Sequence, residues 1–355
     1  MAHANRDEPL LPSFGVKLNG QPLVADVSMW VANVTIEEDL ELPAMFTLEL
    51  ISREEEHGTF GWADEDRLAL GSSIELSMGY GDDREQLIVA EITALEPTFS
   101  TAGPSTLIVR GYDKRHRLNT TRRTRSFVDQ KDSDIAAQIG SDVGLTVDST
   151  DSGVTHAYVL QADQTDLEFL QGRARRMRYE LAMDGETLVF RPAANADSDV
   201  VTLTLDDDLF EFRPRMSLVP LTGIQLRAWD PKEKQVITSS AKSGDEVSKM
   251  DGAQSAAAQA DVVVGANVES VVRTPVMSQA EADQIALARF NNAALDFIRG
   301  DGRARGRTDI RAGRVIRLDD LGDRFSGQYY VTSAVHRYTR REGYLTDFRV
   351  QRNAS

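Results

Sequence analysis

The sequence predicts a mostly β protein of the α+β class, with two similar β-barrel domains and small α+β segments inserted between them. Two β-rich blocks, 70–112 and 312–352, share one plan: a short strand led by glycine, a turn, a long strand, a polar turn and a closing strand. Helical periodicity is confined to shorter stretches between these blocks. Alternation and glycine turns are generic to β-meanders, so the blocks are either a true duplication or two unrelated meanders.

The composition indicates a globular protein with two or three domains. The chain has 355 residues, of which 41% are hydrophobic and 27% are charged. No apolar run approaches the roughly 18–20 residues of a membrane helix, and the N-terminus lacks the apolar core of a signal peptide. The absence of cysteine excludes disulfides and thiolate metal sites, and it is compatible with synthesis in the cytoplasm.

The formal net charge of −16 argues against a nucleic-acid-binding protein, which needs cations to neutralise phosphates. Two local clusters have the opposite sign: the first basic stretch (114–125) and the second basic stretch (299–307). Each is either a solvated surface that pairs with the acidic excess or a docking surface for another protein.

The first half of the chain reads as a β-barrel followed by an insert. Residues 1–13 form an N-terminal extension, and 14–112 form the first barrel because apolar and polar residues alternate there. Residues 113–199 change to an α+β pattern.

Three local signals define this α+β insert. A helix is expected to begin at Asp132 and to end at Gly144. A second helix is expected over 165–177, because Thr165 and Glu168 form a capping-box pattern. The Asp-Gly pair at 184–185 predicts a β-hairpin over 179–190.

The second barrel is predicted from 200–240 together with 309–355, and 241–308 is a second insert. In this insert 241–275 reads as a flexible loop, so we expect a deletion of 246–260 to leave folding largely intact. A capping-box helix follows from Ser278 to Ile298, and Gly300 ends it. The glycine-rich segment 300–306 is interpreted as a turn.

No active site is legible in the sequence, so no catalytic residue, cofactor-binding residue or metal ligand is predicted. The five histidines (3, 57, 116, 156 and 336) lack the spacing of a helical zinc site. The acidic runs at 64–66, 82–83, 206–208 and 319–320 read as solvated turns. Calcium capture by 206–208 stays open, although the EF-hand spacing is absent.

Several motifs occur in order along nearly the whole chain. They are Gly111-Tyr-Asp-Lys-Arg-His116-Arg-Leu118, Arg122-Arg-Thr-Arg-Ser-Phe127, Asp132-Ser-Asp-Ile135, Tyr158-Val-Leu-Gln161, Gln164-Thr-Asp166 with Glu168-Phe-Leu170, Met177-Arg-Tyr-Glu-Leu181, Leu188-Val-Phe-Arg-Pro192, Arg227-Ala-Trp-Asp-Pro-Lys232, Phe325-Ser-Gly-Gln-Tyr-Tyr-Val-Thr-Ser333 and His336-Arg-Tyr338. With these motifs the chain resembles the phage late-control D family and the hub part of VgrG-type proteins of contractile injection systems.

The resemblance implies a structural baseplate hub without enzymatic activity. Such a hub is a homotrimer whose six barrels form a pseudo-sixfold ring that adapts a threefold spike to a sixfold inner tube. The chain stops after its last strand, so the resemblance implies a trimeric spike on a separate polypeptide. Its other expected partners are the inner tube protein and baseplate wedge and LysM-type tail proteins. The hub would be assembled in the cytoplasm as part of a phage tail or tail-like particle.

Two other functions are weighed against the hub. The first is a tail-associated hydrolase of the cell wall, which would need a pair of carboxylates in a cleft. The second is a carbohydrate-binding β-protein, which would need exposed aromatic platforms. Trp30 and Trp229 lie in strand-like sequence and are interpreted as core residues.

Overall fold

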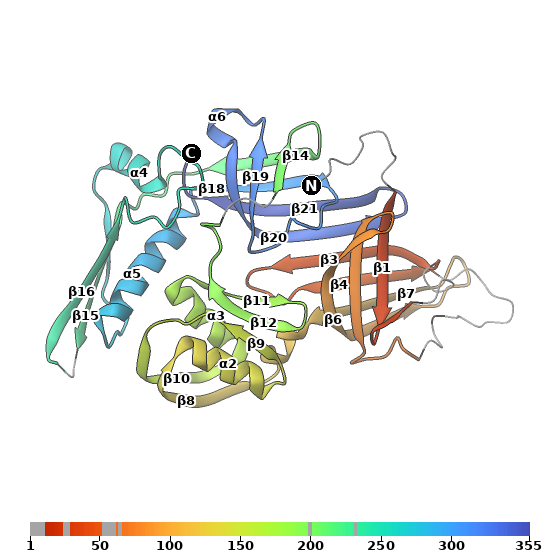
Figure 1. Cartoon of the computed structure of the whole chain (residues 1–355), viewed down its shortest axis with the longest axis horizontal. Coiled ribbons are helices and arrows are strands. Elements are labelled where there is room, and N and C mark those ends of the chain that lie inside the picture. The colour runs from red at the N-terminus through yellow and green to blue at the C-terminus, as the bar shows by residue number, and fades with distance from the viewer. Residues whose placement is uncertain (1–10, 24–28, 52–61, 63–65, 198–200, 231–232) are drawn as a thin grey trace.

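The computed structural model describes residues 11–23, 29–51, 62, 66–197, 201–230 and 233–355. Its main feature is a 13-stranded sheet, which contains both of the predicted meanders (Figure 1). Smaller sheets of two, three and three strands lie beside it. The prediction of a mostly β fold with small α+β segments is therefore confirmed. In the described part of the chain, no helix is long and apolar enough to span a membrane.

Repeat 1 of the main sheet has six strands in the spatial order β3-β4-β7-β6-β5-β1, all antiparallel. They are β1 (Pro12–Leu18), β3 (Val31–Asp39), β4 (Met45–Ile51), β5 (Ser73–Tyr80), β6 (Asp83–Thr98) and β7 (Thr106–Asp113), and the short β2 (Gln21–Pro22) pairs with β1. Their inward-facing apolar side chains form one core cluster.

Repeat 2 has the corresponding order β14-β18-β21-β20-β19-β13 and a core cluster of its own. Its strands are β13 (Val201–Thr204), β14 (Leu209–Met216), β18 (Ile298–Arg305), β19 (Val315–Asp319), β20 (Gly327–Thr339) and β21 (Gly343–Arg352). The short helix α6 (Gly322–Phe325) connects β19 to β20. One pairing differs in direction, because β13 is parallel to β19 whereas β1 is antiparallel to β5.

Two irregularities of the strand pairing coincide in the two repeats, whereas the shift in β5–β6 at 76–77 has no counterpart in β19–β20. A shift in register interrupts β6–β7 at 92–94 and β20–β21 at 331–333. A second shift interrupts β3–β4 at 31–33 and β14–β18 at 209–211. Each bulge inserts one residue at a defined place, so two matching bulges identify equivalent residues in the two repeats. This agreement favours a true duplication over two unrelated meanders.

The two repeats form one sheet because β20 pairs with β3 along its C-terminal half. The pairs run from Ser333 opposite Asp39 to Thr339 opposite Asn33. We call this pairing the internal join. In Figure 1 it places the four central strands β21, β20, β3 and β4 side by side.

The α+β insert lies below the main sheet in Figure 1. It consists of the 3₁₀ helix η1 (Lys114–Asn119), β8 (Arg122–Lys131), α2 (Asp132–Asp142), β9 (Thr146–Ser149), β10 (Thr155–Thr165), α3 (Asp166–Met177), β11 (Tyr179–Asp184) and β12 (Thr187–Pro192). The Thr165–Glu168 capping box, the turn at Gly144 and the hairpin at Gly185 are confirmed. These signals act over a few residues, which is why the sequence predicts them well.

The second insert lies at one end of the molecule. It contains α4 (Ala256–Val264), β17 (Val268–Val271) and α5 (Gln279–Ala294), and the preceding strands β15 (Gly223–Asp230) and β16 (Gln235–Lys242) lie beside it. β15 pairs with β16 and β17 in a separate sheet, and α5 packs against that sheet in a fourth apolar cluster.

The predicted helix from Ser278 to Ile298 is wrong at its C-terminal end. Ser278 caps it as expected, but α5 ends at Ala294 and residues 298–305 form β18 inside the main sheet. Gly300 and Gly302 are strand residues, so the turn predicted at 300–306 is wrong too. A Cβ at Gly302 would lie 2.2 Å from the ring of Phe348 on β21. The glycine is therefore required by a ring that is distant in sequence, and helical periodicity cannot reveal it.

The prediction of a flexible loop over 241–275 is wrong for residues 256–264 and 268–271. The segment forms α4 and β17, and its alanines 256, 257 and 260 are buried. Two backbone hydrogen bonds of 3.0 and 3.1 Å join Gln254 to Ser355 at the C-terminus. Alanine-rich sequence resembles a linker, but here small side chains allow α4 to pack closely against neighbouring backbone.

The prediction assigned 200–240 to the second barrel, and the strand pairing differs there. β13 and β14 join the main sheet, whereas β15 and β16 do not. Trp229 on β15 is 58% exposed because it lies on the face of that sheet opposite the buried Leu226. Trp30 packs against the core of repeat 1 as expected. The division of the chain into domains stays a prediction, as does closure of either repeat into a barrel.

Candidate interaction surfaces

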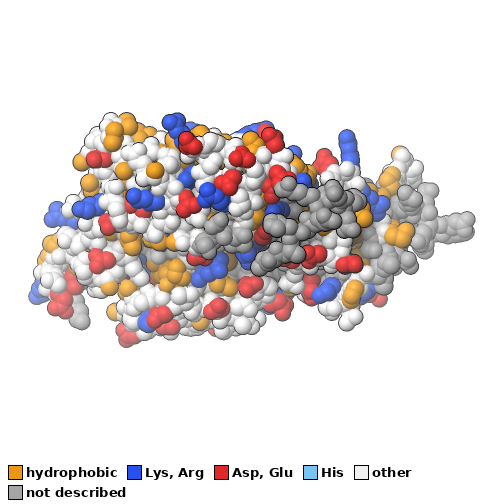
Figure 2. Space-filling view, turned by 45° about the horizontal axis from the view of Figure 1, so that its top comes forward, with side chains coloured by type: hydrophobic (Ala, Val, Ile, Leu, Met, Phe, Trp, Pro, Cys, Tyr) orange, Lys and Arg blue, Asp and Glu red, His pale blue; other side chains and the backbone are white. Residues whose placement is uncertain are grey.

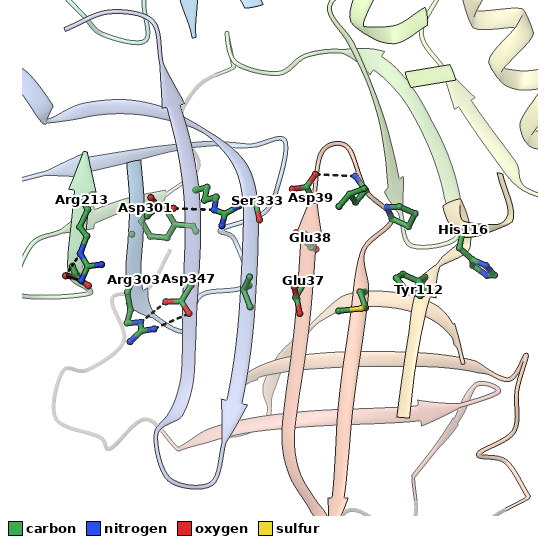
Figure 3. Close-up of a pocket in the computed structure, with 18 of the residues that line it drawn as sticks. Glu37, Glu38, Asp39, Tyr112, His116, Arg213, Asp301, Arg303, Ser333 and Asp347 are labelled. Atoms are coloured by element: carbon green, nitrogen blue, oxygen red, sulfur yellow. Dashed lines mark hydrogen bonds and ion pairs between the residues drawn. The ribbon is translucent and has the colours of Figure 1, made fainter. Parts of the chain in front are cut away.

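A groove of about 1020 Å³ crosses one face of the main sheet at the internal join (Figure 3). It takes side chains from both repeats, and most of them are polar. Those labelled in Figure 3 are Glu37, Glu38, Asp39, Tyr112, His116, Arg213, Asp301, Arg303, Ser333 and Asp347.

Cross-strand ion pairs occupy the acids of this groove on the repeat 2 side. Asp347 accepts from Arg303 at 2.6 Å and lies 3.5 Å from Arg337. Asp301 lies 3.3 Å from Arg349 on the neighbouring strand. Opposite charges directly across a sheet stabilise the pairing modestly and leave a surface of mixed charge. Such a groove suits docking of a polar protein surface better than acid–base catalysis.

The acidic runs at 82–83, 206–208 and 319–320 lie among the described residues. In the described part of the chain, no cluster of three His, Asp or Glu side chains could hold a metal ion. Of the run 206–208, Asp208 accepts a hydrogen bond from the Thr204 N–H at 2.8 Å and another from Arg307 at 3.1 Å. Its carboxylate therefore stabilises the turn between β13 and β14. Of the run 64–66, only Asp66 lies among the described residues.

The histidines of the main sheet and η1 have structural partners. His3 and His57 lie outside the described residues. His116 Nε2 lies 2.7 Å from the Glu91 carboxylate. His336 is fully buried at the internal join, and burial lowers its pKa to about 4, so its ring is neutral.

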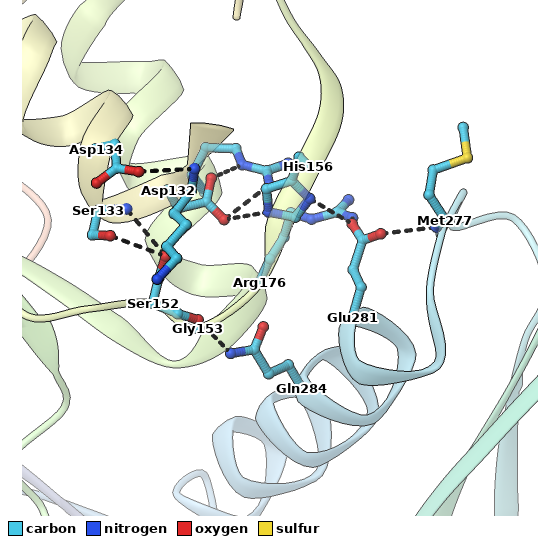
Figure 4. Close-up of polar contacts among 12 residues, drawn as sticks. Asp132, Ser133, Asp134, Ser152, Gly153, His156, Arg176, Met277, Glu281 and Gln284 are labelled. Atoms are coloured by element: carbon cyan, nitrogen blue, oxygen red, sulfur yellow. Dashed lines mark hydrogen bonds and ion pairs between the residues drawn. The ribbon is translucent and has the colours of Figure 1, made fainter. Parts of the chain in front are cut away.

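The remaining histidine belongs to a buried polar cluster between the α+β insert and α5 (Figure 4). His156 Nε2 lies 2.9 Å from Asp132, and its Nδ1 lies 3.7 Å from Glu281. Arg173 donates to Asp132 at 2.9 Å, and Arg176 donates to Glu281 at 2.9 Å. The cluster thus joins α2, β10 and α3 of one insert to α5 of the other.

This cluster has the composition of a catalytic dyad but not its geometry. Burial alone would raise the pKa of Asp132, but hydrogen bonds from His156 and Arg173 outweigh it and hold that pKa below its ordinary value. Both ring nitrogens of His156 face carboxylates, and its side chain is only 8% exposed. The buried ring is therefore not accessible to a substrate, and the cluster connects the two inserts.

The first basic stretch finds its partners within the chain. Arg115 is buried, and it donates to Asp113 at 2.9 Å and to the Leu181 carbonyl at 3.0 Å. Arg125 reaches Asp166 at 2.7 Å. The Arg115 contacts attach the α+β insert to repeat 1, and the Arg125 contact lies within the insert. Both favour pairing with acids of the same chain over a docking surface. Figure 2 shows acidic and basic side chains interspersed on one face of the molecule.

Two open strand edges were missed by sequence analysis. β14 is the last strand of the main sheet, and among the described residues no strand extends along its outer edge. β5 pairs with β6 as far as Glu91, and Gly71 and Ser72 bond to Ile92, but no described strand pairs with residues 94–98 of β6 on that side. Pro97 and Pro214 were the available signal, because proline within a sheet is confined to edges and bulges.

Comparison with known proteins gives one family and a shared fold. The family model described as the Alg8 N-terminal domain matches residues 9–340. A search of curated proteins finds no match.

Solved structures of similar fold come from phage tails and a secretion system. The 43 kDa tail protein of prophage MuSo2 from Shewanella oneidensis superposes with a TM-score of 0.69 at 16% identity, over 96% of this chain and 98% of that one. A tail protein from Neisseria meningitidis gives 0.68 at 12% identity, over 96% of each chain. The Escherichia coli protein c3393, a component of the type VI secretion system, gives 0.61 at 13% identity, over 96% of this chain and 77% of that one. At such identities the likeness shows the fold alone.

Proposed function

Since the chain belongs to the Alg8 N-terminal domain family and shares its fold with phage tail and type VI secretion proteins, we propose that it is a structural baseplate hub of a contractile tail or injection system. The observation that carries this proposal is the duplication: six strands in one order with matching bulges, present twice in one chain.

The duplication suits a protein that connects threefold and sixfold symmetry. A closed ring of three copies presents six similar repeats around one axis. In the proposed hub this ring carries a separate trimeric spike on one face and the sixfold inner tube on the other. Baseplate wedge and LysM-type tail proteins are its further proposed partners, and the particle is assembled in the cytoplasm.

The proposed role is structural and not enzymatic. A glycosidase needs two carboxylates facing a bound sugar, one of them protonated at working pH. In the groove Asp301 and Asp347 are instead held by arginines on neighbouring strands. A cell-wall hydrolase is therefore the weaker candidate.

Mass measurement of the purified protein and symmetry-free cryo-EM of the assembled particle test the hub. We expect three copies and six repeats related by a rotation of about sixty degrees. A ring of two, four or six copies, or repeats that fail to superpose under that rotation, would refute the hub. A parallel assay for peptidoglycan solubilisation should show no lysis, and lysis would favour the hydrolase.

A further inference from the structure

A smaller cavity of about 330 Å³ lies where both inserts meet the main sheet. Its lining includes Arg178 at the end of α3, Glu180 on β11, Asn292 on α5 and Tyr330 on β20. We call it the junction cavity. A molecule bound there would contact the α+β insert, the second insert and repeat 2 at the same time.

Buried polar atoms without a hydrogen-bond partner gather at this cavity. In the described part of the chain they are Arg178 Nε, both carboxyl oxygens of Glu180 and the Tyr330 hydroxyl. Arg191 Nε and Asn195 Nδ2 adjoin them in the same condition, since Asn195 Oδ1 accepts from Arg178 and Arg191 Nε lies 3.9 Å from Glu180. Buried polar groups are nearly always paired, so this concentration of unpaired atoms indicates a binding site.

Most of these unpaired atoms act as hydrogen-bond donors. Guanidinium and amide N–H groups donate and do not accept, and a tyrosine hydroxyl does both. Glu180 supplies the only carboxyl group of the set. Arg178 and Arg191 together bring two positive charges, which one carboxylate does not balance. A ligand that satisfies the set must therefore supply hydrogen-bond acceptors and negative charge.

The Glu180 carboxyl does not itself act as that anion. It lies 3.9 Å from Arg191 Nε, which is too far for a hydrogen bond. Burial raises the pKa of Glu180 to about 8, so at pH 7 the group is mostly protonated and becomes one more donor. Burial also lowers the pKa of Arg178 to about 10, which leaves its guanidinium charged at neutral pH.

The two other acids that line the cavity already have cationic partners. Glu41 pairs with Arg175, and Asp296 pairs with Arg299. These four side chains are 48–59% exposed, whereas Arg178 is only 8% exposed. The two acids therefore do not offset the positive charge that is buried with Arg178.

We propose that the junction cavity binds a small oxyanion, anchored by the Arg178 guanidinium and the Tyr330 hydroxyl, with Arg191 and Asn195 adjoining. The ligand is either tetrahedral, such as sulfate or phosphate, or a carboxylate, because both present several acceptor oxygens to the planar donor group of an arginine. Its binding would hold the two inserts against the main sheet. This site does not depend on the proposed hub.

Equilibrium dialysis of the full chain with labelled sulfate at pH 7 and low ionic strength tests the site. Tyr330→Phe removes one hydroxyl that has no partner among the described residues, so the fold should be kept. Its sulfate affinity should fall about tenfold, as expected for a hydrogen bond to a charged group. Arg178→Lys keeps the charge but removes the Nε–H donor, and it should also weaken binding. The exposed substitution Arg341→Gln is the control and should change nothing.

The pH dependence of sulfate binding gives a second readout. Sulfate stays a dianion between pH 7 and 9, whereas Glu180 loses its proton in this range. Only the protonated carboxyl donates to an anion, so the parent should bind about tenfold more weakly at pH 9 than at pH 7. Glu180→Gln stays neutral, and it should bind sulfate with the same affinity at both pH values. Adsorption to surface arginines would not respond to this substitution.

The outcomes decide between a built site and unspecific attraction. Binding that Tyr330→Phe weakens and Arg341→Gln leaves unchanged supports the site. Acetate in place of sulfate then shows whether a carboxylate or a tetrahedral anion is preferred, and either preference supports it. A parent that binds neither anion, or that binds no better than Tyr330→Phe, overturns the proposal. An affinity that is equal at pH 7 and 9 overturns the part assigned to Glu180. The mass of the assembly, which tests the hub, is independent of all these results.

Discussion

Gly71 and Gly313 occupy equivalent positions in the two repeats. Each lies two residues before a strand, Gly71 before β5 and Gly313 before β19. Both have positive φ, +84° and +79°. The Gly71 N–H donates to the Ile92 carbonyl at 2.8 Å, and the Gly313 N–H donates to the Val331 carbonyl at 2.9 Å. The acceptors are themselves equivalent, since each precedes the same bulge.

Substituting these glycines should reveal how their surroundings differ. Gly71→Ala should lower the free energy of unfolding by about 1–2 kcal/mol, the cost of a left-handed backbone with a Cβ. Gly313→Ala should cost more, because its Cβ would lie 3.3 Å from Glu180 Oε2 and from Leu40 Cδ2. Urea unfolding at one protein concentration measures both. Gly103→Ala, with open space around its Cβ, is the neutral control; equal costs for Gly71 and Gly313 would contradict this expectation.

Glu180 should make the fold less stable as pH rises. Burial raises the pKa of this carboxyl from 4.5 to about 8, and Arg191 and Arg178 lower it only partly. Between these values the folded state binds the proton and the unfolded state does not, so stability falls as pH rises from about 4.5 to 8. Glu180→Gln should flatten this profile and stabilise the protein by on the order of 1–3 kcal/mol at pH 8, with little effect near pH 4.5. Thermal melts across this pH range measure the effect, and the exposed substitution Glu233→Gln is the control. The prediction is refuted if the stability of both variants depends on pH as that of the parent protein does.

His336 should act at the acidic end of the stability profile. Its pKa is lowered by burial from 6.5 to about 4, so the unfolded state binds more protons in this window. The contribution of the neutral His336 ring to the free energy of unfolding is therefore fully present above about pH 6.5. This contribution is lost as pH falls through 4, by on the order of 2–3 kcal/mol. His336→Gln removes this titrating group from the internal join. Urea unfolding between pH 4 and 7 should show a shallower acid limb for the variant, and an unchanged limb would count against the prediction.

Deletion of 246–260, expected from sequence to be harmless, should instead destabilise the protein. Met250 and Ala256 are buried, and the segment pairs with the C-terminus. A smaller change tests the same contact: Gly252→Ala would place a Cβ 2.3 Å from the Cβ of Ala354. It should cost about 1–3 kcal/mol as an overpacked contact, whereas Lys249→Ala on the exposed surface should cost little. Thermal melts measure both changes. If the deletion and Gly252→Ala melt like the parent protein, the expectation that this segment is dispensable for folding holds after all.

The sequence by itself determined the features that depend on near neighbours. The Thr165–Glu168 capping box, the turn at Gly185 and the two meanders were predicted because their hydrogen bonds and side-chain alternation span only a few residues. It also indicated that no acid or histidine stands out as a catalytic group. The groove, however, was not predicted, because it exists only when both repeats lie in one sheet.

Tertiary structure decided what depends on residues far apart in the chain. Residues 298–305 are a strand because Gly302 lies beneath Phe348 and pairs with β21, although the preceding helical pattern runs into them. Trp229 is exposed because it lies on the face of its sheet opposite the one that packs against α5. In each case the free energy comes from burial against a distant segment, which local propensity does not contain.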